Sequence, residues 1–227
     1  YIDYGLYSLY DVRKEIQKAR EAPTADPRVE KLDATVVRYM EAYEALAPLI
    51  TAANGYYERK DYKSDKMAEG KALHAKMAPA AVTFLAERAA LDAEMRVFKS
   101  DIDKRTLDSI EAEEGRSARW HVKNVMVEAQ RMIELLPSNA APVVDLKAFD
   151  AALATYAAAV KELDLFAEAY PGKFSVFESQ PRSLLGKLRD FREKVGKAKG
   201  DARRRGGSDL TWIVNEYNMM VSTSQTA

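Results

Sequence analysis

Cysteine is absent from the 227 residues of this chain. A disulfide framework and a thiolate metal site are therefore excluded, and redox chemistry gives no indication of the compartment. No uninterrupted apolar run reaches the roughly 18 residues that a membrane-spanning helix requires. Because the sequence opens at Tyr1 in helical pattern, we expect that an upstream segment, such as a signal segment, has been removed. Membrane attachment would then depend on that segment or on a covalent lipid.

An excess of one charge is also lacking, since 35 basic residues balance 35 acidic ones. Nucleic-acid-binding domains usually carry a basic excess, so we expect no nucleic-acid partner. With 47% hydrophobic residues, the chain is long and apolar enough to bury a sizeable core. Its length suits one large helical domain or two small ones.

Histidine is scarce, and neither of the two residues stands in a metal-binding pattern. A di-iron bundle requires two Glu-x-x-His motifs, whereas the residues three positions before His74 and His121 are a lysine and an alanine. We therefore expect no metal and no cofactor. His74 lies near an apolar stripe and is interpreted as a hydrogen-bonded core histidine. His121 stands close to Arg116 and Arg119, and we interpret it as part of an exposed helix face, with anion binding as the alternative.

Motifs for nucleophilic or phosphoryl chemistry are missing as well. The segment Gly172-Lys173-Phe174-Ser175 lacks the upstream glycine of a phosphate-binding loop and follows no strand. No Gly-x-Ser-x-Gly occurs. Clustered acids such as those at 111–114 are typical of solvated partners of Lys and Arg on a charged helix. We predict no catalytic residue and no enzymatic activity.

Helical periodicity is what the sequence has in abundance. Apolar residues recur every three or four positions over most of the chain, which predicts an all-α fold. We expect a single all-helical domain over 1–227, an elongated antiparallel helical bundle around one very long helix at 65–136. Only Pro79 and Gly115 interrupt that helix. One kinked helix is favoured over two helices broken near Gly115, because the apolar phase does not slip.

Shorter helices are predicted on both sides of this segment. A first helix is expected at about 1–20. Asp26-Pro27 is interpreted as the N-cap and first residue of a second helix. That helix is expected to kink or break at Pro48 and to stop at Asn54-Gly55 unless Tyr56-Tyr57 extend it. The remaining predictions are Ser64 or Asp65 as the start of the long helix, a linker at 137–142, a helix at about 145–169 capped by Asp145, an irregular stretch at 173–181, a helix from Leu184 to Val195, and a last helix at about 208–222.

Basic residues concentrate near the C-terminal end of the chain. Ten of them fall within 182–205 against three acids, whereas 87–114 holds nine acids and five bases. One interpretation is a surface for anionic lipid, polysaccharide or a protein partner. The favoured interpretation is that the basic helix packs along the acidic segment 87–114. The candidate anion or partner surface consists of Arg182, Lys187, Arg189, Arg192, Lys194, Lys197, Arg203, Arg204 and Arg205.

Tyrosine is abundant, with 12 residues, most of them in the first quarter of the chain. Tyrosine suits both carbohydrate or partner grooves and ordinary packing with its hydroxyl at the rim of a core. We favour packing over a ligand site. The early residues are Tyr1, Tyr4, Tyr7, Tyr10, Tyr39, Tyr43, Tyr56, Tyr57 and Tyr62.

Several segments together resemble one protein family. They are Tyr1-Ile2-Asp3, the stretch Tyr39 to Leu49, Tyr56-Tyr57 with the turn Lys60 to Asp65, Gly70 to Ala75, Glu114 to His121, and Tyr217-Asn218. The sequence is similar to the YiiG-like family of bacterial lipoproteins, a domain of unknown function, over most of its length. This resemblance implies a secreted precursor that is lipid-modified on an N-terminal cysteine and held at a membrane of the cell envelope. The family offers no established activity and no catalytic residues.

Three functional hypotheses follow. The leading one is a non-enzymatic cell-envelope lipoprotein domain on the periplasmic side that binds a partner or ligand. The second is a structural helical spacer without a ligand site. The third is an enzyme with scattered carboxylate or tyrosine chemistry. A pocket with a titratable cluster favours the enzyme, a flat basic surface around 182–205 favours anion or partner binding, and a solid core without either favours the spacer.

Overall fold

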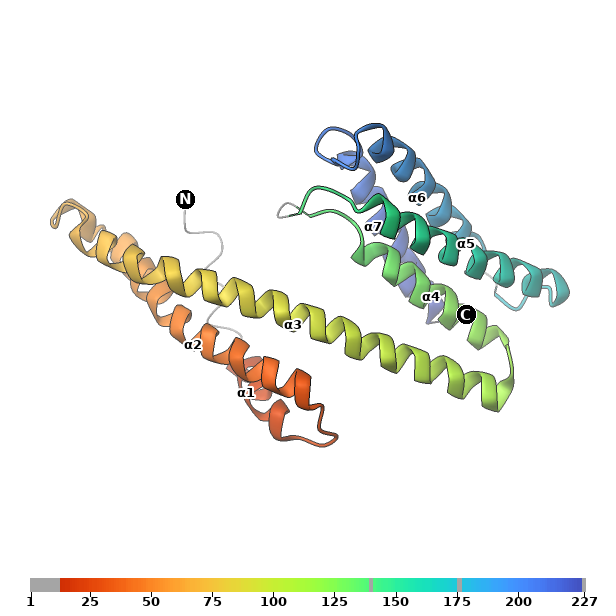
Figure 1. Cartoon of the computed structure of the whole chain (residues 1–227), viewed down its shortest axis with the longest axis horizontal. Coiled ribbons are helices and arrows are strands. Elements are labelled where there is room, and N and C mark those ends of the chain that lie inside the picture. The colour runs from red at the N-terminus through yellow and green to blue at the C-terminus, as the bar shows by residue number, and fades with distance from the viewer. Residues whose placement is uncertain (1–12, 139–140, 175–176, 226–227) are drawn as a thin grey trace. The chain divides into compact units, whose positions relative to one another are not determined.

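The protein, a computed structural model, is described over residues 13–138, 141–174 and 177–225. In these residues every regular element is helical, apart from one isolated bridge between Val143 and Asp201. The all-α prediction is therefore confirmed (Figure 1). The chain divides into two compact units, 1–102 and 103–227, so the prediction of one domain over 1–227 stays a prediction.

The first unit is a helical hairpin with a short helix against it. It contains α1 (Arg13–Glu21), η3 (Ala22–Thr24), α2 (Glu30–Glu58), η4 (Asp61–Lys63) and the first part of α3 (Ala68–Glu114). Residues 1–12 of the predicted first helix lie outside the described residues.

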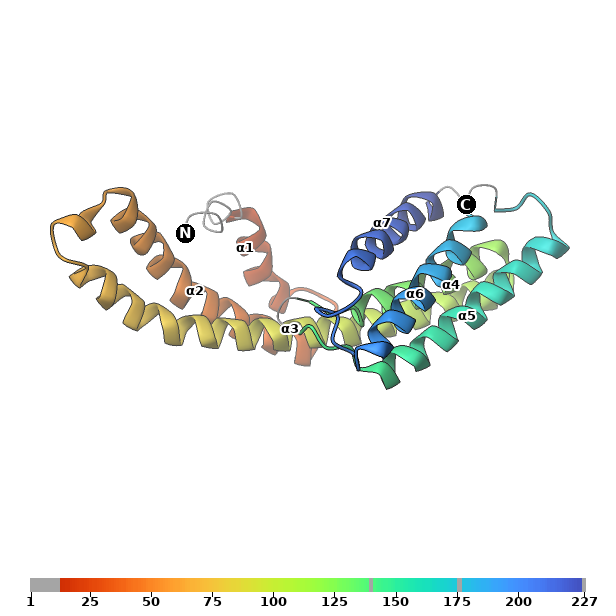
Figure 2. The same cartoon turned by 90° about the horizontal axis from the view of Figure 1, so that it is seen from above.

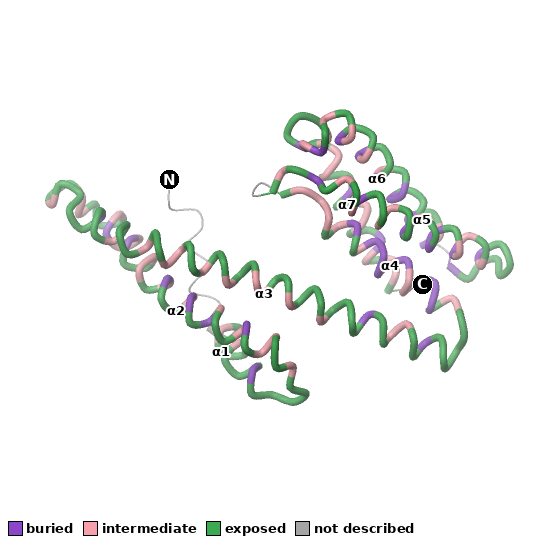
Figure 3. The backbone as a smooth tube through the Cα atoms, viewed as in Figure 1, coloured by how far each residue is buried: buried purple, intermediate pink, exposed green. Residues whose placement is uncertain are grey.

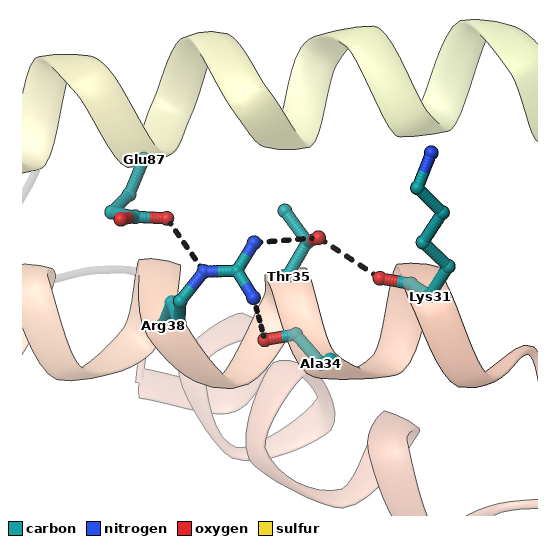
Figure 4. Close-up of polar contacts among 5 residues, drawn as sticks. All are labelled: Lys31, Ala34, Thr35, Arg38 and Glu87. Atoms are coloured by element: carbon teal, nitrogen blue, oxygen red, sulfur yellow. Dashed lines mark hydrogen bonds and ion pairs between the residues drawn. The ribbon is translucent and has the colours of Figure 1, made fainter.

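The two long helices of the hairpin run antiparallel, as their contacts show. Lys31 of α2 pairs with Glu94 of α3 at 2.8 Å, whereas Arg38, seven residues later, pairs with Glu87 at 3.1 Å (Figure 4). The order of contacts thus reverses between the two helices. Farther along, the rings of Tyr39 and Phe84 lie 5.4 Å apart.

The bounds of α2 correct two sequence predictions. The helix begins at Glu30 rather than at Asp26-Pro27, because the Val29 amide at its start donates to the Asp33 carboxylate at 3.0 Å. It also continues through Asn54-Gly55 and ends at Glu58, and Pro48 does not break it. The alternative in which Tyr56-Tyr57 extend the helix is the correct one.

The helix α3 starts at Ala68, three or four residues after the predicted start at Ser64 or Asp65. Asp65 precedes the helix and accepts hydrogen bonds from the amides of Met67 and Glu69 at 2.8 and 2.9 Å. Its Oδ1 also accepts from the buried Tyr56 hydroxyl at 2.8 Å. Burial and this hydrogen bond raise the pKa of Tyr56 to about 12. The polar turn at 59–67 is therefore fixed by one carboxylate that serves both helices.

The predicted continuous helix over 65–136 is wrong. Gly115 adopts a left-handed backbone with φ of 71°, a conformation that ends helices and suits glycine. Ser117 then caps α4 (Ala118–Glu134), its hydroxyl accepting from the Trp120 amide at 3.4 Å. The spacing of apolar residues predicted one helix because the connection of three residues between α3 and α4 leaves the three-four spacing nearly unchanged.

The second unit contains the last part of α3 and a bundle of four helices. The bundle consists of α4, α5 (Leu146–Ala169), α6 (Ser179–Lys197) and α7 (Gly207–Ser224). The helices form a closed ring, since α4 packs against α5 and α7, and α6 packs against the same two (Figure 2). The core lies inside this ring, where buried positions concentrate (Figure 3).

Each helix of the ring contributes fully buried side chains to this core. Val125 of α4, Phe149 of α5, Leu188 of α6 and Ile213 of α7 are all 0% exposed. Burial of one such side chain stabilises the fold by about 1.5–3 kcal/mol. Tyr156 lies among them and satisfies its hydroxyl by donating to the Pro181 carbonyl at 3.0 Å.

The predictions for the last three helices are close to the observed bounds. Asp145 caps α5 as expected, its carboxylate accepting from the amides of Lys147 and Ala148 at 3.0 Å. The helix α6 begins at Ser179, inside the stretch that was predicted to be irregular, and α7 is slightly longer than its predicted range 208–222. Among the described helices, none is long and apolar enough to cross a membrane.

Candidate functional site

A groove in the second unit is a concave site formed by three helices. Its volume is about 450 Å³, within the range of small-ligand pockets. The end of α3, one face of α4 and the last turns of α7 form its walls. It is lined by Asp103, Thr106 and Ile110 of α3; Arg119, Val122, Lys123, Met126, Val127 and Gln130 of α4; and Tyr217, Val221 and Ser224 of α7.

The helix α4 places its groove residues by simple helical spacing. Arg119, Lys123, Met126 and Gln130 recur three or four residues apart, which puts them on one face. A second face of α4 carries Val125, Ala129 and Met132 into the bundle core, and Val122 belongs to both the core and the groove. One helix therefore packs the core and lines the groove at the same time.

An ion pair lies in the wall of the groove. Lys123 Nζ is 2.6 Å from Asp103 Oδ1, and Asp103 is only 8% exposed. A carboxylate this buried is costly unless it is paired, so Lys123 provides the compensation and is itself held in place. Arg119, at the rim, pairs with Glu114 at 2.7 Å. These pairs connect α3 and α4 beyond the break at Gly115.

Tyr217 supplies a neutral hydroxyl to the groove. Partial burial raises its pKa, and the nearby carboxylates of Glu134 and Asp103 raise it further. The phenol therefore keeps its proton at neutral pH and is able both to donate and to accept a hydrogen bond. Together with the apolar walls, it suits an uncharged or amphipathic ligand.

The lining of the groove combines paired charges with apolar and neutral polar groups. Its two cations are paired with carboxylates, and the rest of its lining is apolar or carries neutral polar groups. Within the described residues, no group of three or more His, Cys, Asp or Glu side chains is placed to hold a metal ion.

Both interpretations of the histidines are corrected by the structure. His74 was expected in the core but is exposed on α3. His121 was expected on an exposed face but is 7% exposed, with its ring 4.7 Å from that of Phe166 and 5.2 Å from that of Trp120. Periodicity within one helix does not reveal which side another helix covers.

The surroundings of His121 favour its neutral form. Burial lowers its pKa, Glu162 opposes that effect, and Arg116 adds to it. Arg116 lies 4.6 Å above the Trp120 ring and 3.8 Å from Glu162. In the described part of the chain, neither His121 Nδ1 nor Trp120 Nε1 has a hydrogen-bond partner.

The basic residues of α6 meet carboxylates of the adjoining helices. Arg192 pairs with Asp150 of α5, with an Nη2–Oδ2 distance of 2.7 Å. Lys194 pairs with Asp209 of α7 at 2.7 Å. The same pattern holds for Arg182 with Asp164 at 2.8 Å and Lys187 with Glu216 at 3.5 Å.

The remaining basic residues are paired locally or exposed. Lys197 pairs with Glu193 on α6, and Arg203 and Arg204 both approach Asp201. Among the described residues, Arg189, Lys199 and Arg205 have no ion pair. The intramolecular pairing was predicted correctly, but the partners lie between 150 and 216 rather than in 87–114. Anion or partner binding by this surface stays a prediction.

The tyrosines that the structure describes pack as expected. Tyr56 is fully buried, and its ring lies 5.1 Å from that of Tyr57 and 6.5 Å from that of Tyr62. Gly70 allows this packing, since a Cβ there would lie 3.0 Å from the Tyr56 ring. Tyr1, Tyr4, Tyr7 and Tyr10 lie outside the described residues.

Sequence reasoning did not identify the groove. Of its lining, only Arg119 had been considered for binding, as part of an anion site near His121, and Tyr217 had been noted only for the family resemblance. The available signal was in α4, where Val122, Met126 and Val127 extend the apolar surface beyond the stripe of Val125. A helix that is apolar on a wide arc has more than one surface to cover.

Comparison with known proteins identifies a family for this chain but no function. Residues 2–226 match the family described as a protein of unknown function, DUF3829. The chain belongs to the DUF3829 family. The DUF3829 chain is also 26% identical over 238 residues to the uncharacterized protein YiiG of Escherichia coli strain K12. That match covers 96% of this chain and 65% of the relative's length. No solved structure shows a significant match.

Proposed function

We propose that this chain is a non-enzymatic binding domain of the bacterial cell envelope, and that the groove of the second unit holds its ligand. The observation that carries this proposal is the 450 Å³ groove with apolar walls and a small set of polar groups. Such a combination is the usual composition of a ligand site. The ligand class that fits is a small amphipathic molecule.

The envelope location rests on the resemblance to a family of lipoproteins. In this proposal a lipid on an N-terminal cysteine upstream of Tyr1 holds the domain at the periplasmic side of a membrane. Such an anchor brings the groove close to envelope components, which are amphipathic themselves.

A structural spacer is the second candidate, and α3 is the observation that favours it. A helix of 47 residues extends about 70 Å at 1.5 Å per residue. A spacer needs a long rigid element but no ligand. An experiment that fills the groove separates the spacer from the binding domain.

Filling the groove tests the proposal. Met126 lines the groove, whereas Met219 of α7 is 55% exposed and outside the lining. Met126→Trp and Met219→Trp are therefore a matched pair. We expect a protein-free envelope extract to raise the melting temperature of the wild type and of Met219→Trp by several degrees, since a ligand at 100 times its Kd stabilises the fold by about 2.7 kcal/mol.

The same extract is expected to leave the melting temperature of Met126→Trp unchanged, because the larger side chain occupies the space of the ligand. A rise that is equal in all three proteins would place binding elsewhere. No rise in any of them would favour the spacer. Circular dichroism of each variant confirms that the fold is retained before the comparison.

A further inference from the structure

The charges in the lining of the groove are compensated within the protein itself. Among the described residues that line the groove, the charged side chains are Asp103, Arg119 and Lys123. Lys123 Nζ lies 2.6 Å from Asp103 Oδ1, and Arg119 Nη1 lies 2.7 Å from Glu114 Oε1. A ligand that enters the groove therefore meets cations that already have carboxylate partners.

The two ends of the groove differ in polarity. Along α4, Arg119 at one end and Gln130 at the other are about 16 Å apart. Tyr217 lies toward the Gln130 end: burial raises the pKa of its phenol, and the carboxylates of Glu134 and Asp103 are close enough to raise it further. Glu134 is one turn beyond Gln130 on α4. The apolar walls of the groove are formed by Ile110, Val122, Met126, Val127 and Val221.

The end of the groove at Tyr217 offers neutral hydrogen-bonding groups. The Tyr217 phenol both donates and accepts. Gln130 Nε2 donates to Glu134 at 3.0 Å, and the same amide has a second N–H and a carbonyl oxygen beyond that bond. Hydroxyl groups also donate and accept at one atom, so a head that carries hydroxyls matches this end of the groove.

The ion pair of Asp103 and Lys123 disfavours a charged head at this end. An anionic head at Lys123 would face the Asp103 carboxylate, which is only 8% exposed, and a cationic head would compete with Lys123 for that carboxylate. Either exchange leaves a largely buried charge with weaker compensation, which is costly. The charges of Arg119 and Glu134 are exposed, so water and salt screen them, and neither holds a charged head tightly.

We propose that the ligand of the groove is an amphiphile with a single alkyl chain and an uncharged head that carries hydroxyls, and that the pair of Asp103 and Lys123 determines this specificity. The alkyl chain lies along the apolar walls, and the head meets Tyr217 and Gln130. A single chain suits a volume of about 450 Å³, near the lower end of the range of ligand pockets. This inference rests on the proposed function, since it takes the groove as the ligand site.

A panel of probes with equal alkyl chains and different heads tests the ligand class. Isothermal titration calorimetry of the full chain at neutral pH compares monodecanoylglycerol and decyl glucoside, which are uncharged, with decanoate and decylammonium. We expect at least one uncharged probe to bind about tenfold or more tightly than either charged probe. This binding is expected to be lost in Met126→Trp and retained in Met219→Trp, which places it in the groove.

Removal of one charge of the pair is expected to change the preferred head. Asp103→Asn keeps the shape of the side chain but removes the carboxylate beside Lys123, so we expect the affinity for decanoate to rise about tenfold or more. Lys123→Gln is the reciprocal change and is expected to raise the affinity for decylammonium. The control is Asp108→Asn, the same substitution at an exposed position of α3 outside the lining, which should leave the affinity for all four probes unchanged.

The contrary results separate this inference from the proposed function. A charged probe that binds as tightly as the uncharged ones, and loses its binding in Met126→Trp, would overturn the selectivity and leave the groove as the ligand site. Equal binding by the wild type and Met126→Trp would overturn both. Failure of every probe to bind would overturn the ligand class, while the envelope extract still tests the groove. The wild-type panel decides the selectivity even if a variant at the buried Asp103 does not fold, which circular dichroism reveals.

Discussion

At the scale of single residues, burial of polar groups distinguishes this chain more than any motif does. Asp103 and Glu128 are each 8% exposed, and each meets a cation of α4. His121 is equally buried but lacks a partner at Nδ1 within the described residues. The sequence did not predict these environments, because burial of one helix face depends on which other helix covers it.

His121 gives the unfolding equilibrium a pH dependence. Its pKa is lowered in the folded state, mainly by burial, while the unfolded state keeps the ordinary value near 6.5. Below that value the unfolded chain binds more protons, so stability is present above it and is lost as the pH falls. One proton changes the free energy of unfolding by at most about 1.4 kcal/mol per pH unit.

We therefore expect urea unfolding between pH 7.5 and 5.5 to show a decrease in stability that is smaller in His121→Gln. The control is His74→Gln, which makes the same substitution at an exposed position and so measures the effect of replacing a histidine outside the core. A wild-type slope in both variants would show that His121 is not the group responsible.

At the scale of elements, the break between α3 and α4 decides how the second unit is built. Gly115 reverses the chain so that α4 enters the bundle and lines the groove. The signals were local and present in the sequence: glycine at a helix end, then a serine two residues later as the next cap. The unbroken three-four spacing of apolar residues was given more weight than these local signals, and it wrongly predicted one continuous helix.

Local signals were sufficient elsewhere. Asp145 predicts the start of α5 correctly, because its carboxylate satisfies the first free amides of the helix. By contrast, Asp26-Pro27 has the same appearance but does not begin α2, which starts at Glu30. The ring order of the four helices, and with it the groove, depends on long-range packing that no local pattern contains.

The substitution Gly115→Ala tests the break through the sign of its effect. An alanine in the left-handed region costs about 1–2 kcal/mol, and nothing within 4 Å of the new Cβ adds a clash. In an uninterrupted helix the same change would instead stabilise by about 0.5–1 kcal/mol. We expect urea denaturation to show destabilisation by Gly115→Ala and a smaller loss for Gly115→Asn, since asparagine tolerates this backbone better. Stabilisation by alanine would contradict the break.

At the scale of the whole molecule, burial is uneven along the chain. The cluster of buried apolar residues consists entirely of residues from 122 to 220. The first unit depends on fewer buried side chains, among them Met40, Leu46 and Tyr56. A unit with a large core suits a site that must keep its shape, and the groove is in that unit.

The ion pairs of the basic residues of α6 also lie within the second unit. The basic residues of α6 pair with α5 and α7 inside the second unit, so most of the predicted basic surface contributes to the bundle. Such pairs are individually weak, about 0–1 kcal/mol each, but together they favour these helices as neighbours. The zero net charge of the sequence was consistent with this pairing and did not identify the partners.

The most direct test of the binding function is native mass spectrometry of the full-length protein, released from its own envelope in a mild detergent. We expect the wild type and Met219→Trp to carry a bound small molecule, and Met126→Trp to be free of it. The same occupancy by the small molecule in all three proteins, whether all carry it or none does, would contradict the assignment of the groove as the ligand site.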